Sequence, residues 1–457
     1  ALQGTLVPSG PQFVDASVRE APLGGGAPGD IEVSLPVQVT SDSHYERGQS
    51  VVYDGSEYWL FYGRSDAVTV NYQTGDPDTH DYRVYYKKAS SVAALTAATG
   101  TLVGGTNNAN GYLGETGAAY LGGEVWAFAT IDVGSTADVY GWYTTDGSSW
   151  TEVASIATGL SEGAAHHDEV AFGGELFVLV RRGLDFYTLH SSTPKTGGWS
   201  GEVAVGAGGG GLAHFFNDGS DLYLAVLKSP APRENHIYKY NTGSDSWSLV
   251  ASASSTGWDP TLFKVGTDYV FAQAPWLSDG GGWQYIIAWY SDALDSTFFD
   301  DGSKMVCEGK YGTNTWVDMW PTGFTDAGGD SYLFFTSERN PDDPNAEITG
   351  NIWYLPVTWT AGNEHHTYMQ EAIDAASGTT ISVAPGTYEE TLNIEGQSDL
   401  AIAGEDRDTV IVKADSTLPW DVGGYGSARQ AAVRNVNSTN ITLQNITFDF
   451  DTIKGNS

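Results

Sequence analysis

A pair of short apolar runs joined by a glycine-containing turn recurs along this chain and limits the folds open to it. Residues 257–273, GWDPTLFKVGTDYVFAQ, show the pattern: a polar and aromatic lead, an apolar run, a glycine turn and a second apolar run. Two such runs joined by a short turn predict a β-hairpin. Similar hairpins begin at Ser50, Ala118, Glu169, Ala213 and Thr322. Copies at spacings of roughly 45 to 70 residues indicate a repeat architecture built from strands.

Further apolar runs after the hairpins extend most copies to four strands. The fourth copy, for example, continues from AHFF and DLYLAVL into HIYKYN and WSLVAS. Four antiparallel strands per repeat is the content of a β-propeller blade. We therefore predict an all-β fold that contains a six-bladed propeller, with five blades as the alternative if one copy has been divided wrongly.

The two ends of the repeat region indicate how such a ring closes. The sixth copy lacks an outer strand, whereas 31–39 reads as a strand without a partner and contains Pro36, which suits an edge strand or a bulge. A strand from one terminus that completes the last blade removes an open sheet edge. The predicted propeller therefore spans 31–361 and is closed by the strand 31–39. Residues 1–30, rich in Gly, Pro and Ala, are predicted to be an extended lead or linker.

A different pattern begins at residue 362. Residues 366–376 have apolar side chains at helical spacing, and Ser377-Gly378 ends the predicted helix. Short apolar strands follow closely, in ISVAPGTYEETLNI and LAIAGEDRDTVIV. This combination resembles the N-terminal cap and first coils of the pectin-lyase-like right-handed β-helix superfamily. The resemblance implies that 362–457 is the start of a short right-handed parallel β-helix with an N-terminal capping helix. We expect this β-helix to continue beyond the given chain, and a homotrimer is left open as its assembly.

The charge balance is strongly acidic. Asp and Glu number 57 against 21 Lys and Arg, which gives a net charge of −36. Such a surface repels itself in dilute buffer, whereas at roughly 1 M salt the Debye length falls to about 3 Å and the repulsion is screened. The acidity therefore predicts a high-salt environment, with an ordinary acidic secreted protein as the alternative. The sequence has no basic stripe that could neutralise phosphates, so no nucleic acid partner is predicted.

Cofactors and membrane insertion find little support in the sequence. Cys307 is the only cysteine, which excludes an internal disulfide framework. No apolar run approaches the length of about 18 residues that a membrane-spanning helix needs, so no insertion is predicted. We predict no cofactor and leave open structural Ca²⁺ in the acidic loops 76–81 and 342–347. A metal held by His166, His167, Asp168 and His214 fits no known ligand spacing closely.

The candidate site follows from the propeller prediction. Inner strands of all blades converge on the axis, so side chains at their starts point into one pocket. Converging carboxylates are what glycosidic cleavage needs, and indole rings can stack on sugar faces. The alternative is that Asp and His at strand starts bond backbone N–H groups in turns. The candidate catalytic residues are Glu115, Asp168, Asp259 and Asp318, and the candidate substrate-binding residues are Arg47, His167, His214, Trp258 and Trp320.

Three short motifs carry family resemblances. WDPTLF followed by DYVF, and MWPTGF followed by SYLFFTSE, resemble blades of the furanosidase-type propeller glycoside hydrolases. That resemblance implies an Asp at the start of inner strands and hydrolysis of plant-type or microbial polysaccharides. The stretch TTDGSSW, residues 144–150, resembles the Asp-box of sialidase propellers.

Two functions are compatible with these observations. The first is extracellular glycan recognition by the propeller funnel, in an adhesin or a virus receptor-binding spike of a halophilic system, on a cell or virion surface. The second is a secreted glycoside hydrolase that acts on polysaccharide through the funnel carboxylates. In both, the partner is a polysaccharide or surface glycan.

Overall fold

The chain forms two compact units, residues 36–362 and residues 1–35 together with 363–457. Among the described residues, no helix has the length and hydropathy that crossing a membrane requires. The computed structural model describes residues 31–449 apart from 42–43, 66–81, 106–111, 133–135, 162–166, 207–209, 229–231, 256, 276–284, 309, 312–313, 316–317, 327, 338–349, 358–362 and 414–432.

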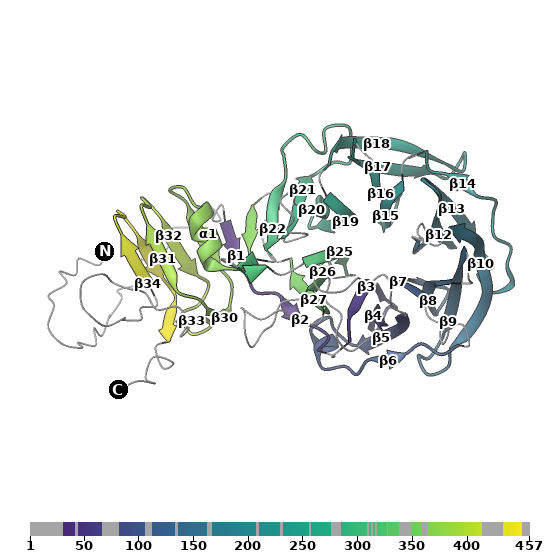
Figure 1. Ribbon diagram of the computed structural model, residues 1–457, viewed down its shortest axis with the longest axis horizontal. Helices are drawn as coiled ribbons and strands as arrows, with labels where there is room; N and C mark the ends of the chain where they lie inside the picture. The colour runs from purple at the N-terminus through teal and green to yellow at the C-terminus, as the bar shows by residue number, and fades with distance from the viewer. Residues whose placement is uncertain are drawn as a thin grey trace. The chain divides into compact units, whose positions relative to one another are not determined.

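Six antiparallel sheets arranged in a ring make up most of the unit 36–362, which confirms the six-bladed propeller (Figure 1). A small antiparallel pair, β23 (Lys310–Tyr311) with β24 (Asn314–Thr315), lies outside the blades. A single residue pair between β5 and β7 joins the first two blades into one hydrogen-bonded sheet. From inner to outer strand, the blades are β3 (Glu46–Tyr53), β4 (Tyr58–Ser65), β5 (Tyr82–Ala89), β6 (Thr101–Leu102); β7 (Tyr112–Leu121), β8 (Glu124–Asp132), β9 (Thr136–Thr144), β10 (Thr151–Ser161); β11 (His167–Phe172), β12 (Glu175–Arg182), β13 (Asp185–Ser191), β14 (Val203–Ala204); β15 (Gly210–Asn217), β16 (Leu222–Lys228), β17 (Glu234–Asn241), β18 (Ser246–Ser254); β19 (Gly257–Val265), β20 (Asp268–Pro275), β21 (Tyr285–Ser291), β22 (Lys304–Glu308); and β25 (Asp318–Thr325), β26 (Ser331–Ser337), β27 (Asn351–Pro356), β2 (Val37–Gln38).

Two outer strands differ from the sequence prediction. The first blade gains β6, which the sequence pattern did not show, because a two-residue strand carries no periodicity. In the fifth blade the outer strand is β22, whereas the apolar stretch at 296–299, which reads as a strand from its sequence, is a turn. β6 and β22 are short strands, so their apolar pattern is weak.

The core of the propeller lies between neighbouring blades. The second strand of each blade is packed on both faces, and β16, for example, is buried from Leu222 through Leu227. Such strands read as continuous apolar runs, because no face of them meets water. Side chains from successive sheets form shared clusters, as where Trp126 and Phe128 of β8 pack with Leu176 and Val178 of β12.

The structure corrects the single strand predicted over 31–39. Only β2 closes the ring: Val37 and Gln38 pair antiparallel with β27, and the buried Lys87 donates a hydrogen bond to the Val39 carbonyl. The preceding strand β1 (Ile31–Val33) belongs to the other unit. Pro36 separates the two strands, since a residue without an N–H interrupts a ladder.

Parallel strands make up the second unit. Its chain passes in turn through three parallel sheets, and the passage then repeats (Figure 1). The short helix α1 (Met369–Ala375) lies within the range predicted as helical, and the Glu390 carboxylate accepts the N–H groups of Met369 and Gln370. The three sheets are β28 (Glu364–His366), β1, β29 (Thr380–Val383), β32 (Ala401–Gly404) and β35 (Thr442–Gln444); β30 (Gly386–Glu389), β33 (Val410–Lys413) and β36 (Thr447–Asp449); and β31 (Leu392–Glu395) with β34 (Val433–Val436).

Strand β1 occupies an interior position in this unit. It pairs in parallel with β28 on one side and β29 on the other, and Ile31 and Val33 are buried in the unit's core. The unit is therefore assembled from two segments that are separated in sequence by the whole propeller. The chain leaves the parallel unit after β1 and returns to it at β28, the strand that pairs with β1. The propeller is therefore an insertion into the parallel unit.

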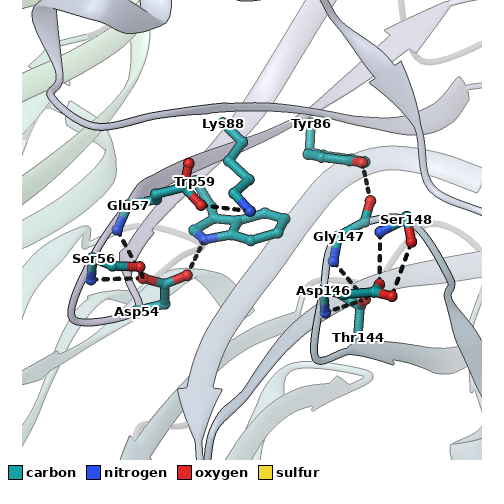
Figure 2. Close-up of polar contacts among 10 residues, drawn as sticks. All are labelled: Asp54, Ser56, Glu57, Trp59, Tyr86, Lys88, Thr144, Asp146, Gly147 and Ser148. Carbon is teal, nitrogen blue, oxygen red and sulfur yellow. Dashed lines mark hydrogen bonds and ion pairs between the residues drawn. The ribbon is translucent and has the colours of Figure 1, made fainter.

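The Asp-box-like stretch has a structural role at a blade edge (Figure 2). The exposed carboxylate of Asp146 accepts the backbone N–H groups of Ser148 and Ser149, at 2.8 and 3.0 Å. Gly147 has a φ of 76°, and its carbonyl accepts the Tyr86 hydroxyl from the first blade. Trp150, which follows, packs edge-on against the first blade's Trp59, Phe61 and Tyr86. The turn thus joins the second blade to the first.

The carboxylate of Asp54 organises a second turn beside the first (Figure 2). It accepts the backbone N–H groups of Ser56 and Glu57 and, at 2.8 Å, the indole N–H of Trp59. Lys88 covers the Trp59 ring at 4.5 Å from its centroid and pairs with Glu57. Both turns therefore fix the same buried indole, one from each side of the blade boundary.

The Asp146 turn predicts an acid-sensitive contribution to stability. Hydrogen bonds from the Ser149 and Ser148 amides lower the pKa of Asp146 to about 2, below its usual 3.8. Because the folded pKa lies below the unfolded one, this contribution is complete above about pH 4 and is lost as the pH falls toward 2. We expect Asp146→Asn to lower the melting temperature at neutral pH, and the gap between wild type and variant to narrow between pH 4 and pH 2. A gap that stays constant over that interval in thermal unfolding would contradict the assignment.

Candidate functional site

A cavity of about 560 Å³ runs along the propeller axis. It is lined by the inner strands of all six blades, β3, β7, β11, β15, β19 and β25. Of the described candidate residues, three line it: Asp168, His214 and Trp320. The predicted convergence at the axis therefore holds for one carboxylate, one imidazole and one indole.

A β-bulge interrupts five of the six inner strands near their starts. The pairing registers show which residues correspond between blades: Ser50, Thr261 and Thr322 each resume the ladder after the bulge. Counting back from these residues places Gly48, Asp259 and Trp320 at one equivalent position, and all three have left-handed φ values of 60°, 50° and 52°. A left-handed conformation is ordinary for glycine and tolerated by aspartate, but it is a strained outlier for a bulky residue such as tryptophan. Strain of this kind concentrates at functional sites.

Gln49 holds the backbone of the strained tryptophan. Its side-chain N–H donates to the Trp320 carbonyl and to the Thr322 hydroxyl, and its amide oxygen accepts the Thr336 hydroxyl. The Gln49 side chain is buried, so each of these bonds is shielded from water. Gln49 thereby joins the first blade to the sixth, at the seam where the ring closes, and keeps the Trp320 backbone in its left-handed conformation.

Arg47 and Trp320 form a cation–π stack beside the cavity. The Arg47 guanidinium lies 5.0 Å from the centroid of Trp320 and 4.7 Å from that of Tyr82, so it is held between the two rings. Arg47 is buried, at 4 % exposure, whereas Trp320 is half-buried and borders the cavity. Of this pair, the indole is the surface available to a ligand.

Asp168 and His214 face each other across two blades. The Asp168 carboxylate accepts the Phe215 backbone N–H at 2.6 Å, and its Oδ2 lies 3.7 Å from His214 Nδ1. The next residue, Glu169, is buried against Gly117 of the second blade, where its carboxylate fills the space that a Cβ would take. Glu169 thus packs between two blades, while Asp168 bonds the neighbouring inner strand and borders the cavity.

The remaining candidate residues lie elsewhere or outside the described part. Asp259 and Asp318 are buried, at 3 % and 0 % exposure, and neither is among the cavity-lining residues. Asp318 accepts a hydrogen bond from the Cys307 thiol at 3.3 Å. Trp258 is half-buried and packs, as Trp320 does, against the buried Ala274 and Met319. The side chains of Glu115 and His167 lie outside the described residues, and so do the acidic loops 76–81 and 342–347 and the side chain of His166.

Two residues of this region were not predicted from the sequence. Gln49 lies one residue after the bulge position but has no charge or ring to single it out, and its partners belong to a distant strand. Arg233 precedes β17 in the fourth blade, and its guanidinium lies 4.6 Å from the centroid of Trp258. Arg233 lies between β16 and β17, away from the inner-strand starts that the repeat pattern singles out, so no sequence signal marks it. Among the described residues, no group of three or more His, Cys, Asp or Glu side chains is placed to hold a metal ion.

Comparison with known proteins gives similarity at the level of structure only. No protein family and no curated protein matches the sequence. A family-43 (GH43_12) protein retrieved from a capybara gut metagenome is 13% identical with a TM-score of 0.35, over 54% of this chain and 51% of that one. A protein of unknown function from Dyadobacter fermentans is 11% identical with a TM-score of 0.49, over 70% and 96%. Trypanosoma rangeli sialidase, solved with sialic acid, is 8% identical with a TM-score of 0.45, over 72% and 58%.

These similarities concern the fold. This chain spans about half the length of the metagenomic family-43 protein. The structural neighbours also include a xylan β-1,4-xylosidase from Bacillus halodurans, 13% identical with a TM-score of 0.34, over 55% of each chain.

Proposed function

We propose that the propeller recognises a glycan in its axial cavity. The observation that carries this proposal is Trp320, a half-buried indole that borders the cavity in a strained left-handed conformation. Flat apolar rings beside a few convergent polar groups are the usual make-up of a small-molecule pocket. Here Asp168 and His214 supply hydrogen-bonding groups suited to sugar hydroxyls, and the indole supplies a stacking face.

Recognition is favoured over hydrolysis because of how the described carboxylates are used. Glycosidic cleavage requires two carboxyl groups that flank one bond. Among the cavity-lining acids, Glu169 packs on Gly117, while Asp218 and Asp326 accept backbone N–H groups within their own hairpin turns. Asp168 also accepts one backbone N–H, from Phe215, but it bonds a neighbouring strand and lies beside His214 at the cavity, so it is the carboxylate best placed to meet a sugar. The secreted glycoside hydrolase is retained as the second candidate, on the ground that Asp168 and His214 lie together at the cavity.

The wider setting belongs to the same proposal. We propose an extracellular or virion-surface protein of a high-salt environment, an adhesin or a receptor-binding spike, in which the parallel unit is the start of a right-handed β-helical stem. The net charge of −36 supports the high-salt setting, and the repeated passage through three parallel sheets supports the stem. A trimer through that stem is part of this proposal.

Replacing Trp320 by glycine tests the recognition site. Glycine already occupies the equivalent left-handed position in the first blade, at Gly48, so Trp320→Gly removes the indole without imposing a new backbone strain. Glycans that bind the wild-type protein are first selected on a glycan array in molar salt. We expect Trp320→Gly to bind these glycans about tenfold more weakly or worse, because a buried aromatic anchor contributes roughly 1.4 kcal/mol or more to the binding free energy. Affinities are measured by calorimetry on the retained glycans.

The control for this experiment is Leu249→Ala, which alters an exposed side chain on the outer strand β18. Its affinities should equal those of wild type. Unchanged binding by Trp320→Gly, or no retained glycan at all, would overturn the proposal. Release of reducing ends by wild type, and its loss in Asp168→Asn, would instead support the hydrolase.

A further inference from the structure

Arg233 and Trp258 form a stacked pair at the boundary of the fourth and fifth blades. The guanidinium carbon of Arg233 lies 4.6 Å from the centroid of the Trp258 ring. Arg233 immediately precedes β17, and Trp258 is the second residue of the inner strand β19. Both side chains are half-buried.

The stacked arginine has no carboxylate partner within the described part of the chain. Several other described cations of the propeller are paired with carboxylates: Arg182 with Glu202, Lys228 with Glu234, and Lys239 with Asp221. The chain carries 57 acidic residues against 21 Lys and Arg, so a carboxylate partner for a basic group is easily found. Arg233 stacks on an indole and, unlike the buried Arg47, is half-buried, so its guanidinium can be reached by an anion from solvent.

The chemistry of a stacked guanidinium points to an oxyanion. Stacking uses the face of the planar group and leaves its N–H donors in the plane, where they match the two oxygens of a carboxylate or sulfate. The aromatic partner fixes the orientation of the plane in advance, so less side-chain entropy is lost when an anion binds. The Arg233 guanidinium is thus a preorganised donor with no carboxylate partner among the described residues.

The pair lies near the proposed glycan site. Trp258 and Trp320 both pack against the buried Ala274 and Met319, and Trp320 borders the axial cavity. A glycan stacked on Trp320 that extends past this shared cluster would therefore approach Arg233.

We propose that Arg233, held by Trp258, forms a subsite for an anionic substituent of the bound glycan, a carboxylate or a sulfate ester. This inference rests on the proposed function and specifies its substrate class. It makes the preferred ligand an acidic polysaccharide, as distinct from a neutral one.

Binding measurements on matched oligosaccharides test the subsite. The probes are oligogalacturonate and a sulfated galactan oligosaccharide, each compared with a neutral galactan oligosaccharide of the same length. We expect wild type to bind at least one of the anionic probes about tenfold more tightly or better, and Arg233→Gln to remove that preference while leaving the affinity for the neutral probe unchanged. The two anionic arms separate a carboxylate from a sulfate. The matched control is Arg182→Gln, which removes an arginine that already has a carboxylate partner and should keep the preference.

A direct readout separates failure of the subsite from failure of glycan recognition. The protein is labelled with 5-fluorotryptophan and observed by fluorine NMR, and the Trp258 resonance is assigned as the one that Trp258→Phe removes. The chemical shift of this resonance is followed during titration with sodium galacturonate, methyl sulfate or galactose. We expect one or both anions to shift it in wild type and not in Arg233→Gln, while galactose leaves it unmoved. Absence of any anion-dependent shift overturns the subsite whether or not glycans bind. Equal affinity of wild type for neutral and anionic probes also overturns the subsite, and leaves glycan recognition standing.

Discussion

Val33→Asp is expected to unfold the parallel unit and leave the propeller folded. Val33 is 1 % exposed, and its strand lies between β28 and β29 in the core of that unit. A carboxylate buried there without a partner costs roughly 4 kcal/mol or more. The propeller is closed by β2, which follows Pro36, so its own ladders remain complete. Hydrogen exchange should show lost protection over 380–413 and retained protection in the blades.

Glu32→Gln is the matched control for this experiment. Successive side chains of a strand point to opposite faces, and the Glu32 side chain accepts a hydrogen bond from Asn363 outside the apolar core. The amide oxygen of glutamine can accept the same bond, so little change is expected. If Val33→Asp keeps full protection over 380–413, then β1 is not essential to the parallel unit and the insertion topology has no energetic consequence.

Gly323→Val is expected to destabilise the propeller strongly at the boundary of its fifth and sixth blades. A Cβ at Gly323 would lie 2.0 Å from Cδ1 and 2.4 Å from Cγ of the Phe263 ring, which is itself buried at 1 % exposure. The ring cannot move away without disturbing the cluster that it shares with Leu333 and Phe335. Overpacking of this kind costs about 1–3 kcal/mol or more, and a branched side chain adds to it. Thermal and denaturant unfolding measure the loss.

A double mutant shows whether the clash is the cause. Phe263→Ala should relieve the effect of Gly323→Val, because the two residues share one volume, so the two destabilisations should not add. Gly243→Ala is the control, since a Cβ there meets no atom within 4 Å and the glycine lies outside the left-handed region. Additive effects in the double mutant would place the strain elsewhere.

Local patterns predicted most of the propeller. The hairpins that start at Ser50, Ala118 and Glu169 correspond to the first two strands of the first three blades, because a strand buried on both faces must be apolar throughout. The helix α1 was likewise visible from its own apolar spacing. These elements depend on neighbours close in sequence, so the information is contained within short stretches of chain.

The site was only partly predictable. Trp320 stood out by its residue type and borders the cavity, whereas Asp259, which occupies the equivalent bulge position in the fifth blade, is buried away from it. Whether the side chain at this position borders the cavity or is buried depends on which side chains of the adjacent blades pack against the strand. Arg233 could not be found from strand starts, because its contact with Trp258 spans two blades.

The amino-acid sequence by itself determined that six hairpin-based sheets would form and that a different, strand-rich pattern would follow them. Only the tertiary structure decided the partners of 31–39, where Val37–Gln38 closes the ring and Ile31–Val33 joins the parallel unit. It also decided which polar side chains border the axial cavity. The physical reason is that apolar periodicity shows whether a residue is buried but not which strand it pairs with. The partners here lie far away in the sequence, as where Val37 pairs with Tyr354 and Ile31 with Ile381, and no local pattern specifies such a pairing.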